Sequence, residues 1–98
     1  MKARENQTIA ETTNLVISHF PNPVVDFTTI DFEKEFDGEA TIQLFDNYGR
    51  LIRTENVSDL PTGKHKLEWD MATMNSGTYF LEFRNGDKKT TKQMMILK

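Results

Sequence analysis

The last quarter of the sequence constrains the fold most strongly, because it has the pattern of a β-hairpin. Residues 77–84 and 88–97 are rich in Tyr, Phe, Leu, Thr, Met and Ile, most of which favour strands. Asn85-Gly86 stands between these two runs, and this dipeptide tolerates the positive φ angles at both central positions of a type I′ turn. We therefore predict a closing hairpin with Asn85 and Gly86 as its two turn residues.

Five further runs of strand-like composition precede this hairpin and are separated by Pro, Gly, Asn and Asp. Apolar residues alternate with polar ones, as in Ala40, Ile42 and Leu44, and no run sustains a helical period. The five runs span residues 15–20, 24–32, 39–46, 50–57 and 64–70. Seven short strands with turn signals about every 8–12 residues predict an all-β, antiparallel immunoglobulin-like β-sandwich, with a small barrel as the alternative.

The length of 98 residues suits one domain with a two-layer core. We assign residues 15–98 to this domain and the polar residues 1–14 to a flexible leader or linker. The leader lacks the apolar core of a secretory signal. If the chain is exported, we expect its secretory signal to lie further upstream.

Composition argues against several function classes. A net charge of −3 does not suit a nucleic-acid-binding protein. The absence of cysteine excludes disulfides, thiolate metal sites and cysteine nucleophiles. The glycines are isolated, so there is no phosphate-binding loop, and no serine lies in a Gly-x-Ser-x-Gly motif. We therefore expect a protein that is not an enzyme and needs no cofactor.

Two groups of side chains have the chemistry of metal ligands. His19 and His65 lack the close spacing of a metal-binding pair, so we interpret them as structural. Five carboxylates alternate along one loop and leave a calcium site open as an alternative to a solvated acidic loop, although the EF-hand order is absent. They are Asp31, Glu33, Glu35, Asp37 and Glu39. Our expectation is no metal.

Charge is unevenly distributed along the chain. Residues 26–46 contain seven acidic side chains and one base, whereas residues 84–98 contain five bases and one acid. The basic last strand could face an acidic neighbour or partner, or its lysines could only prevent edge-to-edge aggregation. Both interpretations stay open, and a homodimer through this edge strand is a further expectation.

Trp69 has two interpretations. It shares a strand face with Leu67, which favours a place in the core. Together with Tyr48 and Tyr79 it could instead form a platform for stacking on carbohydrate. The second interpretation belongs to an immunoglobulin-like adhesion or carbohydrate-binding module, which is our alternative function.

A series of short motifs, in order and at consistent spacing over residues 15–98, resembles a known family. The series comprises Pro21-Asn22-Pro23, residues 38–46 (GEATIQLFD), Gly49-Arg50, Gly63-x-His65-x-Leu67-x-Trp69-Asp70, residues 76–80 (SGTYF) and residues 92–98 (KQMMILK). It is similar to the type A C-terminal sorting domain of the type IX secretion system of Bacteroidetes. Each motif alone is weak, but the ordered set is specific.

The resemblance implies a function as a secretion signal. Proteins with this domain enter the periplasm, and outer-membrane translocon and shuttle proteins then recognise the domain. A sortase-type protease commonly removes it, here in the segment before Leu15, and the cargo reaches the cell surface or the extracellular space. The cargo itself is not part of this chain.

The resemblance also implies roles for particular residues. The late motifs place recognition at Gly77, Tyr79, Lys92, Ile96, Leu97 and Lys98. Pro21, Asn22, Pro23, Gly49, Arg50 and Trp69 are structural motif residues. We expect the last strand to be read by β-augmentation, and Gly77 to occupy a place where a Cβ would clash with an adjoining turn.

Overall fold

A computed structural model describes residues 15–98, and these form seven β-strands and no helix. The strands are β2 (Val16–Phe20), β3 (Phe27–Lys34), β4 (Ala40–Asp46), β5 (Leu51–Asn56), β6 (Gly63–Asp70), β7 (Gly77–Asn85) and β8 (Lys88–Ile96). The all-β prediction is confirmed, and so is the number of strands. Among the described residues there is no helix that could cross a membrane. The predicted leader, residues 1–14, lies outside the described residues.

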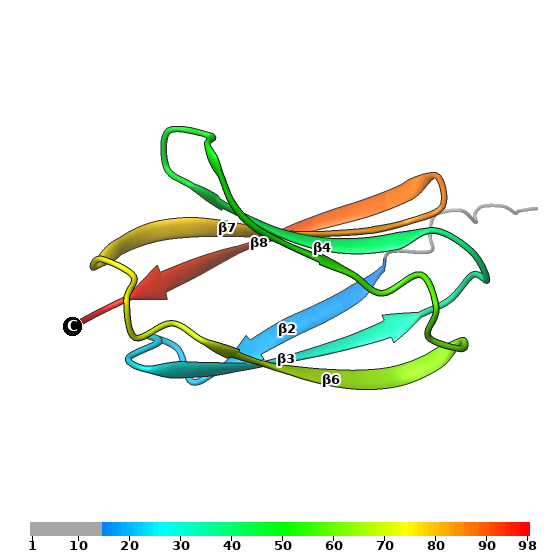
Figure 1. Ribbon diagram of the computed structural model, residues 1–98, viewed down its shortest axis with the longest axis horizontal. Coiled ribbons are helices and arrows are strands. Elements are labelled where there is room, and N and C mark those ends of the chain that lie inside the picture. Colours follow the sequence, from blue (N-terminus) through cyan, green and yellow to red (C-terminus); the bar gives the residue numbers. More distant parts are fainter. Residues whose placement is uncertain (1–14) are drawn as a thin grey trace, which may run out of the picture.

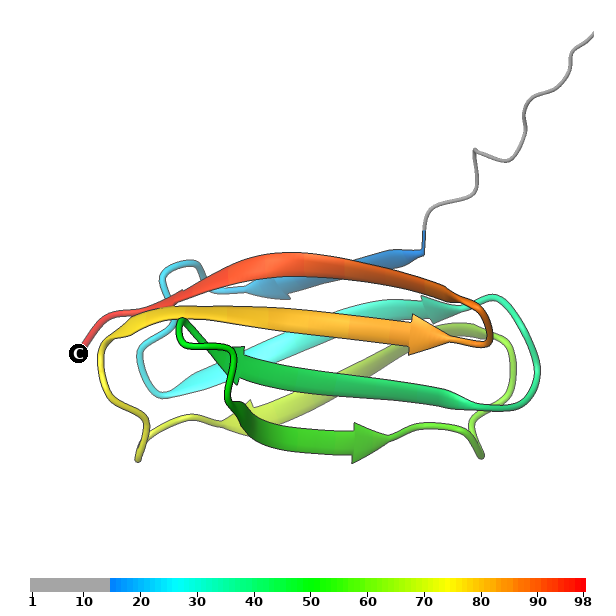
Figure 2. The same ribbon diagram turned by 90° about the horizontal axis from the view of Figure 1, so that it is seen from above.

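The strands form two sheets that pack face to face (Figures 1 and 2). One sheet has the order β2-β3-β6 and the other the order β5-β4-β7-β8, with antiparallel pairing throughout. The chain changes sheet between β3 and β4, between β5 and β6, and again between β6 and β7. This arrangement confirms the predicted immunoglobulin-like sandwich.

The core lies between the sheets and follows the period-two alternation. In β3 the buried residues include Ile30 and Phe32, and in β7 they include Leu81 and Phe83. The rings of Phe32 and Phe83 meet edge to face across the two sheets, with centroids 5.3 Å apart. Burial of such side chains is the main source of the domain's stability.

The second strand begins three residues later than predicted, at Phe27. The reason is that Val24 bonds to the other sheet. Its amide donates to the carbonyl oxygen of Met95 at 2.8 Å, and its carbonyl accepts from the amide of Leu97 at 2.9 Å. Val24 therefore forms an isolated parallel bridge with Ile96, beside β8.

The turn of the closing hairpin was predicted one residue too early. Asn85 is the last residue of β7 and pairs with Lys88, so the two turn residues are Gly86 and Asp87. Gly86 has a φ of 62°, and its amide donates to the carbonyl of Glu39. A buried role for the Asn85 side chain, described below, explains why this residue stays in the strand.

The connection between β6 and β7 contains one hydrogen-bonded turn, from the amide of Met74 to the carbonyl of Met71. It ends at a feature typical of immunoglobulin-like sandwiches. The hydroxyl of Tyr79 donates to the carbonyl of Asn75, four residues earlier, at 2.8 Å, in the manner of a tyrosine corner. This bond fixes the entry into β7.

Candidate recognition surface on the last strand

Two of the six predicted recognition residues lie in the core. Tyr79 is 8% exposed and Ile96 is 2% exposed. Ile96 pairs with Gly77 at the far end of the hairpin, and Tyr79 lies opposite Met94, which is also buried. A substitution at Tyr79 or Ile96 would therefore affect folding before it affected any contact with a partner.

The other four predicted residues are exposed, namely Gly77, Lys92, Leu97 and Lys98. The expected clash at Gly77 is wrong, because a Cβ there would lie 3.8 Å from Cε1 of Tyr79, an ordinary contact distance. Leu97 is 59% exposed although its amide is bonded to Val24. Its apolar side chain is thus available on the surface at the end of the last strand.

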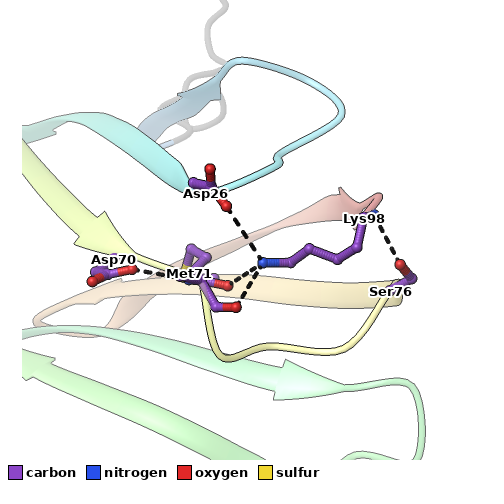
Figure 3. A network of polar contacts seen from close by, with 6 residues as sticks. Asp26, Asp70, Met71, Ser76 and Lys98 are labelled. Atoms are coloured by element: carbon purple, nitrogen blue, oxygen red, sulfur yellow. Dashed lines mark hydrogen bonds and ion pairs between the residues drawn. The ribbon is translucent and has the colours of Figure 1, made fainter.

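Lys98 is exposed, but both its side chain and its backbone amide are bonded to other parts of the fold (Figure 3). Its Nζ donates to the carbonyl oxygens of Met71 and Ala72 at 2.9 and 3.0 Å, and lies 3.9 Å from a carboxylate oxygen of Asp26. Its amide donates to Oγ of Ser76 at 2.9 Å. These contacts join the end of β8 to the β6–β7 connection and to the segment before β3, so Lys98 stabilises the fold. We call this set of contacts the Lys98 fastening.

The outer edge of β8 is half covered and half open. Asn85 and Lys88 close a two-residue turn as a hydrogen-bonded pair, so the even-numbered residues of β8 bond to β7 and the odd-numbered ones direct their N–H and C=O outward. The outward carbonyl of Met95 is bonded to Val24, and that of Gln93 accepts from Nε2 of His19 at 3.2 Å.

Further toward the turn, the outward groups of β8 are unpaired. The N–H and C=O groups of Lys89 and Thr91 and the N–H of Gln93 have no hydrogen-bond partner within residues 15–98. We call residues 88–93 the open half of β8. Figure 2 shows β8 as the outermost strand of its sheet, with β7 on one side only.

The corner Pro21-Asn22-Pro23 follows β2 and leads the chain past the end of β8 before β3 begins. The peptide bonds before both prolines are cis. Because β2 is an edge strand of one sheet and β8 of the other, the corner brings Val24 to the place where it covers the last residues of β8. The predicted structural role of this motif thus has a geometric basis.

Gly49 and Arg50 belong to a turn built around Asp46. The Asp46 carboxylate accepts from the amides of Tyr48 and Arg50, both at 2.9 Å, and from Nε of Arg50 at 2.7 Å. Gly49 has a φ of 83°, a conformation that favours glycine. Desolvation acts to raise the pKa of Asp46, but the bonds from Arg50 and Tyr48 outweigh it and lower that pKa below its usual range.

Trp69 is a core residue, as its alternation predicted. It is 1% exposed, its Nε1 donates to the Glu55 carboxylate at 3.2 Å, and the Arg53 guanidinium lies 4.4 Å from the ring centroid. Tyr79 is also buried, whereas Tyr48 is 79% exposed. The aromatic platform proposed for carbohydrate is therefore wrong.

Two buried polar residues were missed by sequence reasoning. The Asn85 side chain accepts from the amides of Glu35 and Phe36 and donates to the carbonyls of Phe36 and Glu39. The prediction of Asn85 as a turn residue concealed this role.

The second missed residue is Lys34. Its Nζ donates to the carbonyls of Ser58 and Leu60 at 2.6 and 2.7 Å, and the residue is 1% exposed. The signal was available, because Ile30, Phe32 and Lys34 share one strand face by period two.

The described residues give little indication of a catalytic or metal centre. A surface depression of about 560 Å³ lies over β2, β3 and β6, and two charged side chains that line it, Asp31 and Lys66, are paired at 2.8 Å. Nε2 of His65 bonds to the carbonyl of Pro61, which is a structural contact. Within residues 15–98 no three His, Cys, Asp or Glu side chains gather as metal ligands.

The sequence of residues 18–97 matches the family described as the secretion system C-terminal sorting domain. The chain belongs to this family. Members of the sorting-domain family act as type IX secretion signals, so this chain is a sorting signal for export to the cell surface or the extracellular space. A sorting domain is a tag rather than a catalyst, and its contacts are with the secretion machinery and an upstream cargo.

Other comparisons add little to this assignment of a sorting domain. No curated protein matches the chain in sequence. Among solved structures, the chain is similar to the sulfur carrier protein SoxY from Chlorobium limicola f thiosulfatophilum. The identity is 15%, the TM-score is 0.47, and the match covers 88% of this chain and 81% of that chain. A likeness of this degree supports no conclusion about function.

Proposed function

We propose that the outer-membrane translocon and its shuttle proteins recognise the folded sorting domain through the surface of β8. The observation that carries this proposal is the family match over residues 18–97. Two exposed residues of the predicted set, Lys92 and Leu97, mark the accessible part of this surface. An unpaired strand edge offers backbone donors and acceptors to a receptor strand.

The cargo precedes the domain, passes through the periplasm, and is released or anchored when a sortase-type cysteine protease cuts before Leu15. The described chain enters the sandwich at the end opposite the marked C-terminal end (Figure 1). A protease acting before Leu15 would work at the end of the sandwich opposite Leu97, which is also the end where β8 begins.

The cut is tested by mass spectrometry of an exported reporter fused to residues 1–98. The proposal predicts a reporter that ends within residues 1–14 in the normal strain and keeps the whole domain in a strain whose sortase lacks its catalytic cysteine. A reporter with the same end in both strains would contradict cleavage by that protease.

The immunoglobulin-like adhesion or carbohydrate-binding module is the other candidate, but burial of Trp69 and Tyr79 removes its aromatic platform. Substitution of the exposed Leu97 by Ala separates the two functions without removing a core residue. A sorting signal should lose export of the reporter with an unchanged melting temperature. An adhesion module should show no change in export.

A further inference from the structure

We propose that the open half of β8, residues 88–93, accepts an extended strand of a partner protein that carries acidic side chains four residues apart. The inference rests on the proposed function, because the partner is taken to be a protein that handles the sorting signal. It goes further because it names the part of the β8 edge that binds the partner and the charge and spacing of the partner's side chains.

The backbone of the open half is ready for strand addition. Lys89, Thr91 and Gln93 direct N–H groups away from β7 with no partner among the described residues, and Lys89 and Thr91 do the same with their carbonyls. Beyond Gln93 the edge is occupied by Val24. An incoming strand therefore finds about five free donors and acceptors, and its length is limited by the Val24 bridge.

The side chains of the open half set the charge of the partner. Lys88 and Lys92 lie opposite Asn85 and Leu81, both buried, so both lysines occupy the core-facing side of β8 and yet are exposed at its edge. Neither forms an ion pair with any of residues 15–98. Lys89, on the outer face, lies 3.6 Å from Glu82, which Arg84 also approaches.

The spacing of these lysines defines the spacing of the acids. Residues 88 and 92 are four apart on the same strand face, which corresponds to about 13 Å along the strand. A strand hydrogen-bonded to β8 has the same repeat, so the side chains next to the two lysines are also four residues apart. Acidic residues at these two positions would pair with Lys88 and Lys92 across the new strand pair.

The same lysines disfavour the alternative occupant, a second copy of this chain. Pairing β8 with another β8 would bring together two open halves that each carry Lys88, Lys89 and Lys92. Like charges across adjacent strands are destabilising, and lysines at an edge are a known obstacle to self-pairing. The lysines of the open half thus favour an acidic partner strand and disfavour pairing with a second copy of this chain.

The experiment measures binding of a capped, fluorescein-labelled peptide, Thr-Glu-Val-Thr-Val-Glu-Thr, to the chain of residues 1–98 by fluorescence anisotropy. We expect saturable binding that weakens as salt is added. Lys92→Glu should weaken binding about fivefold, whereas the charge-matched control Lys64→Glu, on β6, should change it less than twofold. A peptide with lysine in place of both glutamates should bind the double variant Lys88→Glu/Lys92→Glu better than the wild type.

Peptide methylation separates strand addition from simple charge attraction. N-methylation of one alternate set of peptide amides should abolish binding, while methylation of the other set should leave it unchanged. Equal effects of both sets, or of Lys64→Glu and Lys92→Glu, would overturn the proposal. So would a chain that is dimeric by light scattering and binds no peptide, which would assign the edge to a second copy. Circular dichroism and melting curves check that each variant is folded.

The export assay distinguishes failure of this inference from failure of the proposed function. If the peptide does not bind and the Lys88→Glu/Lys92→Glu reporter is exported normally, only the acidic-strand proposal is wrong. If the wild-type reporter is not exported by an intact type IX system, the proposed function is wrong.

Discussion

The amide of Val24 donates to the carbonyl oxygen of Met95 at 2.8 Å, although Val24 connects β2 to β3 in one sheet and Met95 belongs to β8 in the other. The returning bond from the Leu97 amide to the Val24 carbonyl makes this a two-bond bridge. The end of the last strand is thereby part of the fold as well as of the recognition surface. Substitutions there must be analysed for stability and for export separately.

The Lys98 fastening predicts a loss of stability in Lys98→Ala. The variant loses two charge-assisted bonds to the carbonyls of Met71 and Ala72, and such bonds contribute about 1.5–3 kcal/mol each when well shielded. The side chain is 27% exposed, so we expect a total of about 1–2 kcal/mol after allowance for solvent screening. Urea denaturation measures it, with Lys64→Ala as the control. An unchanged midpoint would contradict the fastening.

The hydroxyl of Tyr79 predicts a structural effect without a recognition effect. Tyr79→Phe keeps the ring in the core and loses only the bond to the Asn75 carbonyl, so it should cost about 1 kcal/mol. Reporter export should be retained at a temperature where the variant is folded. If Tyr79→Phe stays fully folded and loses export, the hydroxyl contacts a partner and the structural assignment is wrong.

The Asn85 side chain predicts the largest effect of a single polar substitution. Asn85→Ala leaves the amides of Glu35 and Phe36 and the carbonyl of Phe36 without their bonds to this side chain, at about 1–3 kcal/mol for each group that water cannot reach. The carbonyl of Glu39 keeps its bond from the amide of Gly86. We expect a loss of about 3 kcal/mol or more in the free energy of unfolding. Asn75→Ala, at an exposed asparagine, should change it by less than about 0.5 kcal/mol.

The lowered pKa of Asp46 predicts an acid-dependent loss of stability. A carboxylate whose pKa is lower in the folded state stabilises the fold above its unfolded pKa of about 4, and this contribution is lost as the pH falls through the folded pKa. Asp46→Asn should therefore destabilise the domain at pH 7 more than at pH 3. Denaturation curves at both pH values test this, and an equal effect at both would contradict the role of the charge.

The strand count and the fold class followed from the sequence because period-two alternation and turn residues are local signals. The errors arose where a long-range contact overrode the local one. Val24 has strand composition, but its bonds go to the last strand rather than to β2. The dipeptide Asn85-Gly86 is typical of a turn. The side chain of Asn85 instead accepts hydrogen bonds from the backbone amides of Glu35 and Phe36, about 50 residues earlier in the chain.

Assignment of the recognition residues was limited for a related reason. The motif resemblance identified Tyr79, Ile96 and Lys98, yet a motif does not distinguish residues that build the domain from residues that contact a receptor. The packing places the first two in the core and ties Lys98 to the β6–β7 connection. Lys92, on β8, and Leu97, directly after it, are left as exposed residues whose side chains have no such structural contact, and their role in recognition stays a prediction.

The most direct test of the sorting function is export of a fluorescent reporter. The reporter carries an ordinary secretory signal at its N-terminus and residues 1–98 at its C-terminus, and it is expressed in Bacteroidetes strains with and without a working type IX system. We predict reporter at the surface or in the medium only when the system is intact. Reporter retained in the periplasm of both strains would contradict the assignment of this chain as a sorting signal.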